Sequence, residues 1–288
     1  MKLNNIFFAM ATISIFALAS CKKTGVDNTE IENTFELASN GGIAENLTQD
    51  AQEVLNEAAI DKGIAGAGFV AGATETTGIL SCANVTVTPQ NGFPKNIVID
   101  FGATGCTSPN GILRRGKVLV TLSDSLRRPG SVAVMTFDNY IVGIHKKEGT
   151  ITWTNTGANA TASTPTIRSW SRICVNGKIT NTITNNFWLH SGTQNIVQTA
   201  GVNTPNILLD DVFSITGNRT VTKADGATRV GTIITALQKK TSCNYIDKGT
   251  YQIQGTNNVA LIDFGNGDCD DQATITINGQ TPRTFTLR

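Results

Sequence analysis

Residues that could carry out acid-base or metal chemistry are few in this sequence and far apart. Two carboxylates are enough to hydrolyse a glycosidic bond, and the acids that folding could bring together are Asp138, Glu148, Asp210 and Asp211. The two histidines, His145 and His190, have no other metal ligand beside them in the sequence. The chain has no Gly-x-Ser-x-Gly, His-Glu-x-x-His or Cys-x-x-Cys motif. Catalysis would therefore require residues that are distant in sequence to converge.

One acidic loop offers oxygen atoms of the kind that calcium prefers. In the segment "DFGNGDCDD" the residues Asn266, Asp268 and Asp270 alternate as ligands often do in calcium loops. The related segment "DFGATGCTSPNG" has no acid after Asp100, and neither loop has the closing glutamate of an EF-hand. We therefore interpret the loop as a solvated turn and expect no cofactor, with calcium as the weaker alternative.

Both loops belong to a phrase that the chain contains twice. The letters "IDFG" occur at Ile99 to Gly102 and at Ile262 to Gly265, and in each case a cysteine follows four residues after the glycine. Aligning the chain from Ser81 with the chain from Ser242 matches an earlier cysteine, an apolar strand, Asp-Phe-Gly and the later cysteine. We interpret this match as an internal duplication, with related units near 81–123 and 242–279.

The duplicated cysteines are spaced for disulfides. A hairpin turning at 255–258 would pair Gln254 with about Val259, and extending that register outward places Cys243 opposite Cys269. Facing strand residues have the Cα separation of about 5.5 Å that a disulfide needs. The sequence thus predicts Cys243–Cys269 and, by the same arrangement, Cys82–Cys106. Cys174 is left over, and we expect it to be a buried free thiol.

The Asp-Phe-Gly triplets also occur in protein kinases, where the aspartate binds metal. The glycine-rich loop, strand lysine and His-Arg-Asp loop of a kinase are missing here. We expect Asp100 and Asp263 to accept hydrogen bonds from turn amides, and Gly102 and Gly265 to take a positive φ.

The N-terminus "MKLNNIFFAMATISIFALASCKK" has the anatomy of a secretory signal, with a basic start, an apolar run and small residues before Cys21. The run is shorter than the roughly 20 apolar residues that span a bilayer. Leu18 to Cys21 resembles a bacterial lipobox, which implies cleavage after residue 20 and acylation of Cys21. Several acyl chains on one residue would anchor the protein stably.

Periodicity divides the remaining chain into two parts. Within 21–79 we expect a flexible tether to about Glu45, a short amphipathic helix from Ala44 to Ile60, and a Gly/Ala-rich connector that includes "GAG" at 66–68. From about residue 80 to 288 the period is two, in runs such as "GKVLVTLSD" and "TITWTNT" separated by turn signals. The predicted fold class is all-β, an antiparallel sandwich or open half-barrel preceded by one short helix.

Composition favours a globular exported body. The chain is 40% hydrophobic and 16% charged, with a net charge of +1. This near-neutral balance does not indicate the basic surface that binds nucleic acid. We expect the only arginine pairs, Arg114-Arg115 and Arg127-Arg128, to lie in solvated loops. Trp153, Trp170 and Trp188 could stack on sugar rings, but we favour core positions for them.

Several phrases together resemble a known group of proteins. The lipobox ending in "SCKK", the phrases "IDFGATGC", "PGSVAVMTFDNYIV" and "KKEGTITWTNTG", and the final "IDFGNGDCDDQATITINGQ" are similar to those of Bacteroidota lipoproteins that have no established activity. The resemblance implies a bacterial envelope protein, held by Cys21 in the outer membrane. We expect a non-catalytic binding or structural scaffold whose ligand is a glycan, a protein or an envelope component. The alternative is an exported, glycan-directed hydrolase that uses the scattered carboxylates.

Overall fold

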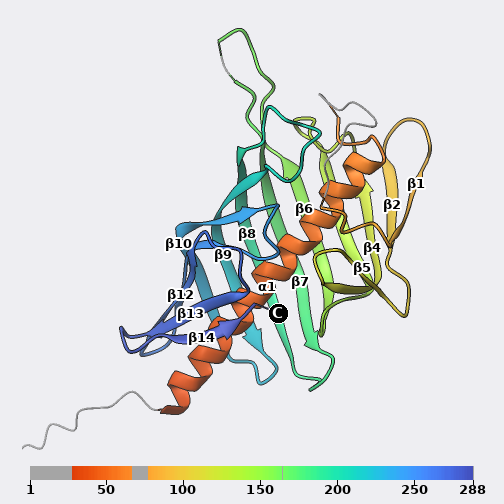
Figure 1. Ribbon diagram of the computed structural model, residues 1–288. Coiled ribbons are helices and arrows are strands. Elements are labelled where there is room, and N and C mark those ends of the chain that lie inside the picture. Colours follow the sequence, from red (N-terminus) through yellow and green to blue (C-terminus); the bar gives the residue numbers. More distant parts are fainter. Residues whose placement is uncertain (1–27, 67–76, 164, 288) are drawn as a thin grey trace, which may run out of the picture.

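The protein consists of one long helix held by one curled antiparallel sheet (Figure 1). The computed structural model describes residues 28–66, 77–163 and 165–287. The predicted signal peptide, Cys21 and most of the Gly/Ala-rich connector lie outside these residues. Among the described residues, no helix is both long and apolar enough to cross a lipid bilayer.

The sheet has 14 strands and is not closed, so the predicted all-β class is confirmed, and a single curled sheet corresponds to the open half-barrel. Each strand is hydrogen-bonded to the next along the chain, except that the short β3 pairs only with β4. The elements are α1 (Asn28–Asp61), β1 (Asn84–Thr88), β2 (Lys95–Asp100), β3 (Cys106–Thr107), β4 (Leu113–Leu122), β5 (Val132–Val142), β6 (His145–Asn155), β7 (Ser169–Asn181), β8 (Phe187–Ala200), β9 (Val212–Lys223), β10 (Thr228–Lys240), β11 (Lys248–Gln254), β12 (Val259–Asn266), β13 (Gln272–Ile277) and β14 (Arg283–Thr286).

Glycine bulges bend the strands around the helix. The pairing register breaks at Gly116 in β4 and at Gly149 in β6, and both glycines have a positive φ, 74° and 107°. A Cβ at Gly149 would lie 2.5 Å from the carbonyl oxygen of Asn176 on β7, and a Cβ at Gly116 would strike the carbonyl of Asn139 on β5. Bulges of this kind increase local twist and bend the strand, which curls the sheet into a trough.

Helix α1 fills this trough. The helix predicted from Ala44 to Ile60 is present as its second half, but the prediction of a flexible tether before it was wrong. The helix begins at Asn28 and has 34 residues, so the part of the predicted tether from residue 28 to Glu45 is helical. It crosses the concave face diagonally from the β12–β14 edge toward β1 and β2 (Figure 1). Its middle is buried all round, including acids such as Glu45 and Asp50 that an amphipathic helix would expose. A helix buried on every side does not need a polar face.

The apolar core lies between α1 and the inward residues of the strands. Leu37, Val54 and Leu55 of the helix join inward residues such as Ile215 and Ile262 in one continuous cluster. Trp153, Trp170 and Trp188 are all buried in it, which is the core position favoured from the sequence.

The duplicated units lie at the two ends of the sheet, where β1 is one edge strand and β14, which follows the second unit, is the other. Each unit is a three-stranded meander, β1–β2–β4 in the first and β11–β12–β13 in the second, with Asp-Phe-Gly at the end of its middle strand. Nine antiparallel pairings separate β2 from β12, so the two middle strands run in opposite directions. The predicted register is present, because Gln254 pairs with Val259.

Two disulfides fasten these edges, as the spacing predicts. Cys82 is bonded to Cys106 with a Cα separation of 5.9 Å, and Cys243 to Cys269 with 5.0 Å. Cys174 is a buried free cysteine. Beside each later cysteine, the Asp-Phe-Gly turn has the expected geometry: Gly102 N donates to Asp100 Oδ1 at 2.8 Å and Gly265 N donates to Asp263 Oδ1 at 2.9 Å, with φ of 75° and 92° at the glycines.

Candidate functional site

Acids on α1 are paired with cations that point inward from the sheet. Glu45 accepts hydrogen bonds from Arg172 on β7 and from Arg219 on β9, the latter at 2.5 Å. Gln194 on β8 donates to the same carboxylate at 2.6 Å. Burial raises the pKa of Glu45, but Arg172 and Arg219 outweigh it and hold that pKa well below its ordinary value. Glu45 is therefore an ionised residue that joins α1 to three consecutive strands.

A second ion pair corrects a sequence interpretation. Arg114 was read as part of a solvated loop, but it is fully buried in β4. Its Nε donates to Asp50 Oδ1 at 3.2 Å, its Nη2 forms an ion pair with the same carboxylate, and Tyr140 Oη donates to Asp50 Oδ2 at 2.8 Å. A buried guanidinium is tolerated when a carboxylate and hydrogen-bond acceptors surround it. Its neighbour Arg115 is half-buried in the same strand.

The third pair lies toward the C-terminal end of the helix. Lys239 on β10 is paired with Glu53, and its ammonium group also donates to the carbonyl of Lys240 at 2.8 Å and to that of Cys243. Burial raises the pKa of Glu53 to about 7 despite the attraction of Lys239. The strand cations and helix acids together form a buried ionic layer between α1 and the sheet, made of Glu45, Asp50, Glu53, Arg114, Arg172, Arg219 and Lys239.

These cations are the main residues that sequence reasoning missed. A usable signal exists, because Arg172 stands two residues after Trp170 and two before Cys174, and so occupies an inward position of its strand. Arg219 likewise stands two residues before the inward Val221. A charged residue at an inward position predicts a buried partner of opposite sign, and the helix acids are the partners available.

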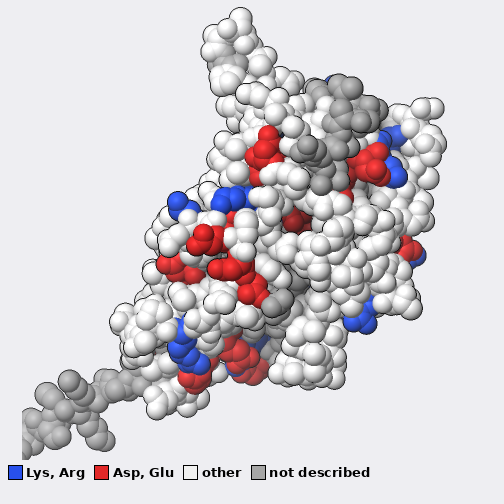
Figure 2. Space-filling model, in the orientation of Figure 1, with Lys and Arg blue, Asp and Glu red and all other residues white. Residues whose placement is uncertain are grey.

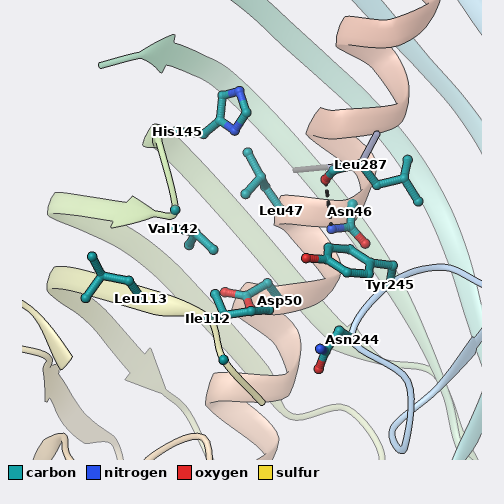
Figure 3. A pocket seen from close by; sticks show the side chains of 12 residues that line it. Asn46, Leu47, Asp50, Ile112, Leu113, Val142, His145, Asn244, Tyr245 and Leu287 are labelled. Atoms are coloured by element: carbon teal, nitrogen blue, oxygen red, sulfur yellow. Dashed lines mark hydrogen bonds between the residues drawn. The ribbon is translucent and has the colours of Figure 1, made fainter. Parts of the chain in front are cut away.

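A pocket opens where loops from the two sheet edges meet over α1. We call it the loop pocket; its volume is about 230 Å³. Figure 3 shows side chains from the helix, the turn after β5 and the loop after β10 converging on it. It is lined by Asn46, Leu47, Asp50, Gly111, Ile112, Leu113, Val142, Gly143, His145, Asn244, Tyr245 and Leu287.

The polar groups of the loop pocket largely hold the surrounding chain in place. Asn46 Nδ2 donates to the carbonyl of Leu287 at 3.3 Å, and Asn46 Oδ1 accepts from Ile246 N. Asn244 Nδ2 donates to the carbonyl of Asn110 at 3.1 Å, which joins the loops of the two duplicated units. Burial lowers the pKa of His145 to about 4, so it is neutral near pH 7. The pocket is thus a mainly apolar cavity. The charged residue in its lining is Asp50, whose charge is neutralised by Arg114.

The four carboxylates proposed for catalysis lie in two separate places: Asp138 and Glu148 are near each other on the neighbouring strands β5 and β6, and Asp210 and Asp211 are adjacent just before β9. Glu148 on β6 is paired with Lys178 on β7, and the same row of paired residues continues through Leu189 on β8 to Thr222 on β9. Asp211 stands one residue before the start of β9. Because Thr222 lies 11 residues after Asp211 on a strand, Glu148 and Asp211 are roughly 35 Å apart along the strand direction. Asp210 accepts from Thr204 Oγ1 and Asp211 accepts from Gln198 Nε2, and Asp138 is exposed on β5.

The weak calcium candidates have other roles in the structure. Asn266 ends β12 in register with Lys248, and Asp270 Oδ1 accepts from Gln272 N at 2.9 Å in the turn before β13. Within the part of the chain that the structure describes, no three His, Cys, Asp or Glu side chains are grouped so that they could hold a metal ion.

Surface charge is sparse on the face that carries the helix. In Figure 2 most of this face is uncharged, and the acidic and basic atoms lie in small separate clusters. No family model, curated protein or solved structure matches the chain.

Proposed function

We propose that the chain is a lipid-anchored protein of the bacterial cell envelope whose β body is a non-catalytic binding scaffold. The anchor would be Cys21, acylated after removal of the signal peptide, and the membrane would be the outer membrane. The two disulfides support an oxidising compartment outside the cytoplasm. The helix begins seven residues after Cys21, so a tether of at most about 25 Å would hold the N-terminal end of α1 close to the bilayer.

The observation that carries the non-catalytic proposal is how the buried ionisable groups are used. Glu45, Asp50 and Glu53 of α1 are held by sheet cations, and the carboxylates considered for catalysis lie in two separate places, Asp138 and Glu148 on β5 and β6 and Asp210 and Asp211 before β9. Catalytic groups need mutual geometry around one reacting centre. Binding needs only a surface or a pocket, and the loop pocket and the exposed strand faces provide both. The ligand would be a glycan, a protein or an envelope component.

The anchor is tested by the Cys21→Ala variant. We expect it to lose the lipid mass and to appear as an uncleaved precursor or as released protein when the cells are fractionated. Cys174→Ala is the matched control, because it removes a thiol without touching the lipobox, and it should remain in the outer-membrane fraction. Acyl chains on the Cys21→Ala protein would contradict the proposal.

The alternative, a glycan-directed hydrolase, is tested by turnover. Purified protein is incubated with glycosidase, esterase and peptidase substrates, with and without calcium, and we expect no turnover. Turnover that disappears in Glu148→Gln or Asp210→Asn, while the melting temperature is unchanged, would establish an enzyme and overturn the scaffold proposal.

A further inference from the structure

A second pocket lies near the C-terminal end of α1, and we call it the end pocket. Its volume is about 360 Å³, which is in the range of small-molecule sites. Loops after β4, β6 and β8 line it. The loop after β4 contacts the chain that follows the helix, because Leu126 N and Arg127 N donate to the carbonyls of Ile64 and Ala65. The polar side chains in the lining are Arg127, Asn159, Thr166, Arg168 and Asn203.

Two arginine side chains reach the same wall of the end pocket. Arg127 Nη1 donates to the carbonyl of Pro205 at 2.6 Å, and Arg168 Nη2 donates to the carbonyl of Val202 at 3.1 Å. Val202 and Pro205 line the pocket themselves, so the charged ends of both side chains lie at it. Arg168 stands two residues before the buried Trp170, and alternation along the chain places both side chains on the helix side of the sheet. This is also the side on which Arg127 lies beside the end of α1.

The two guanidinium groups have donors that the described part of the chain does not satisfy. Arg168 is 9% exposed, and its Nε and Nη1 are buried without a hydrogen-bond partner. Among the described residues, no carboxylate lies within ion-pair distance of Arg127 or Arg168. Buried donors in native proteins are normally paired. These N–H groups are therefore available to an acceptor that the protein itself does not supply.

The end pocket carries positive charge. Burial and the neighbouring charge of Arg168 lower the pKa of Arg127 to about 10, which leaves Arg127 a cation near pH 7. The acid whose charge acts on both arginines is Asp211, which is not part of the pocket lining. Its carboxylate accepts from Gln198 Nε2 at 2.7 Å, and burial raises its pKa to about 7. Asp211 therefore offsets at most one of the two positive charges, and the pocket attracts an anion.

The donors and the charge together favour phosphate over carboxylate. Each guanidinium group uses one hydrogen bond to hold the wall of the pocket and has several other N–H donors. The side chains of Asn159, Thr166 and Asn203 add donors of their own. A phosphate group presents more acceptor oxygens than a carboxylate and up to twice its negative charge. It can therefore satisfy both arginines, whereas one carboxylate leaves part of the charge uncompensated.

We propose that the end pocket binds a phosphate group, which Arg127 and Arg168 hold between them through charge-assisted hydrogen bonds. This inference rests on the proposed binding function and specifies its ligand class. It places the ligand at the opposite end of α1 from Cys21, about 50 Å along the helix, and away from the loop pocket.

The test uses the full-length lipoprotein in detergent, titrated by isothermal calorimetry with inorganic phosphate, with glucose 6-phosphate and with acetate at the same ionic strength. Arg127→Gln removes one of the two cations. Arg128→Gln is the matched control, because Arg128 is the next residue, is exposed and is paired with Asp124. We expect Arg127→Gln to weaken phosphate binding at least about tenfold, which corresponds to 1.4 kcal/mol, and Arg128→Gln to leave it within about twofold.

Melting temperatures in chloride show whether each variant is folded. If Arg127→Gln does not fold, Asn203→Asp places a negative charge at an exposed position of the same lining and should weaken phosphate binding by a similar factor. Saturable binding of either phosphate compound that is lost in Arg127→Gln supports the proposal, and the tighter of the two shows whether the ligand is the free ion or a phosphate carried on a larger molecule.

Three results would overturn the proposal: no saturable binding of either phosphate compound, acetate bound as tightly as phosphate, or equal affinity in Arg127→Gln and wild type. None of these outcomes changes the location of the protein or its lack of turnover, so the broader proposed function would fail separately.

Discussion

Lys147 is a buried cation that has no carboxylate within ion-pair distance in the described part of the chain. Its Nζ donates to Thr48 Oγ1 on α1 at 3.1 Å and lies 5.5 Å from the centre of the Phe137 ring. Burial lowers the pKa of Lys147 from 10.5 to about 8. The charged form is therefore held in the protein at a cost in stability.

We predict that Lys147→Met stabilises the protein at pH 7. Below pH 8 the lysine is charged in both the folded and the unfolded state, and burying that charge costs up to roughly 3 kcal/mol for a shift of this size. As the pH rises from 8 toward 10.5, the folded protein releases the proton first and the penalty disappears. The gain from Lys147→Met, measured by urea unfolding, should therefore be largest below pH 8 and shrink toward pH 10. A gain that does not depend on pH would contradict this explanation.

Glu45 behaves in the opposite way, because its charge is needed. Removing it with Glu45→Gln leaves Arg172 and Arg219 buried without a counter-ion, and breaking a buried pair of this kind costs about 3 to 5 kcal/mol. We expect urea unfolding at pH 7 to show a loss of this size. Glu32→Gln, which removes an exposed partner of Arg283, should change the free energy of unfolding by less than about 1 kcal/mol. Equal effects of the two substitutions would show that the ionic layer is not structural.

Residues that act through local geometry could be predicted from the sequence, and residues that act across the fold could not. Asp100 and Asp263 bond an amide two residues away, so the letters around them are sufficient evidence. Glu45 and Arg219 are 174 residues apart in sequence, and their pairing depends on a helix lying inside a curled sheet. From the sequence alone, where that arrangement is not visible, an acid on a helix is predicted to be solvent-exposed.

At the scale of elements, the strands and the second half of the helix were predictable, and the first half of the helix was not. Alternation of apolar and polar residues identifies a half-buried strand whatever its neighbours are. The N-terminal half of α1 contains Ser39-Asn40-Gly41-Gly42, which are poor helix formers, and tertiary packing decides its conformation. Gly41 and Gly42 lie against the side chains of Tyr251 and Phe285, so their small size permits close approach to the sheet.

The disulfides act on the two edge units. Each closes a short loop, with sequence separations of 24 and 26 residues, and the chain-entropy relation gives a stabilisation of roughly 3 kcal/mol for each loop of this size. We predict that Cys82→Ser with Cys106→Ser lowers the free energy of unfolding by about this amount, as does Cys243→Ser with Cys269→Ser. Denaturant unfolding measures both.

Peptide mapping of the exported protein under non-reducing conditions provides the check on connectivity. Cys82 joined to Cys243, or all five cysteines after Cys21 found as free thiols, would contradict the pairing. Cys174→Ser serves as the control, because Cys174 takes part in neither bond.

At the scale of the whole molecule, α1 and the sheet depend on each other. Withdrawing the helix would leave Arg114, Arg172, Arg219 and Lys239 on the inner face of the sheet without their carboxylates, and would expose the apolar core around them. These four ion pairs connect the middle of α1 to strands on both halves of the sheet, from β4 to β10. The helix is therefore an integral part of the core, although it precedes both duplicated units in the sequence.

We predict that α1 and the central strands open in one cooperative event. Native-state hydrogen exchange, measured against low concentrations of urea, should give the amides of 44–60 the same opening free energy as those of β7 to β9, because cooperative units exchange together. The first turns of α1, whose ion pairs with Lys223 and Arg283 involve exposed acids, should exchange earlier by fraying. In the Glu45→Gln variant, the opening free energies of 44–60 and of β7 to β9 should decrease together and by the same amount. Exchange of 44–60 well before β7 to β9 would instead show that the helix leaves the trough while the sheet stays folded, and α1 would then be a displaceable segment and not a part of the core.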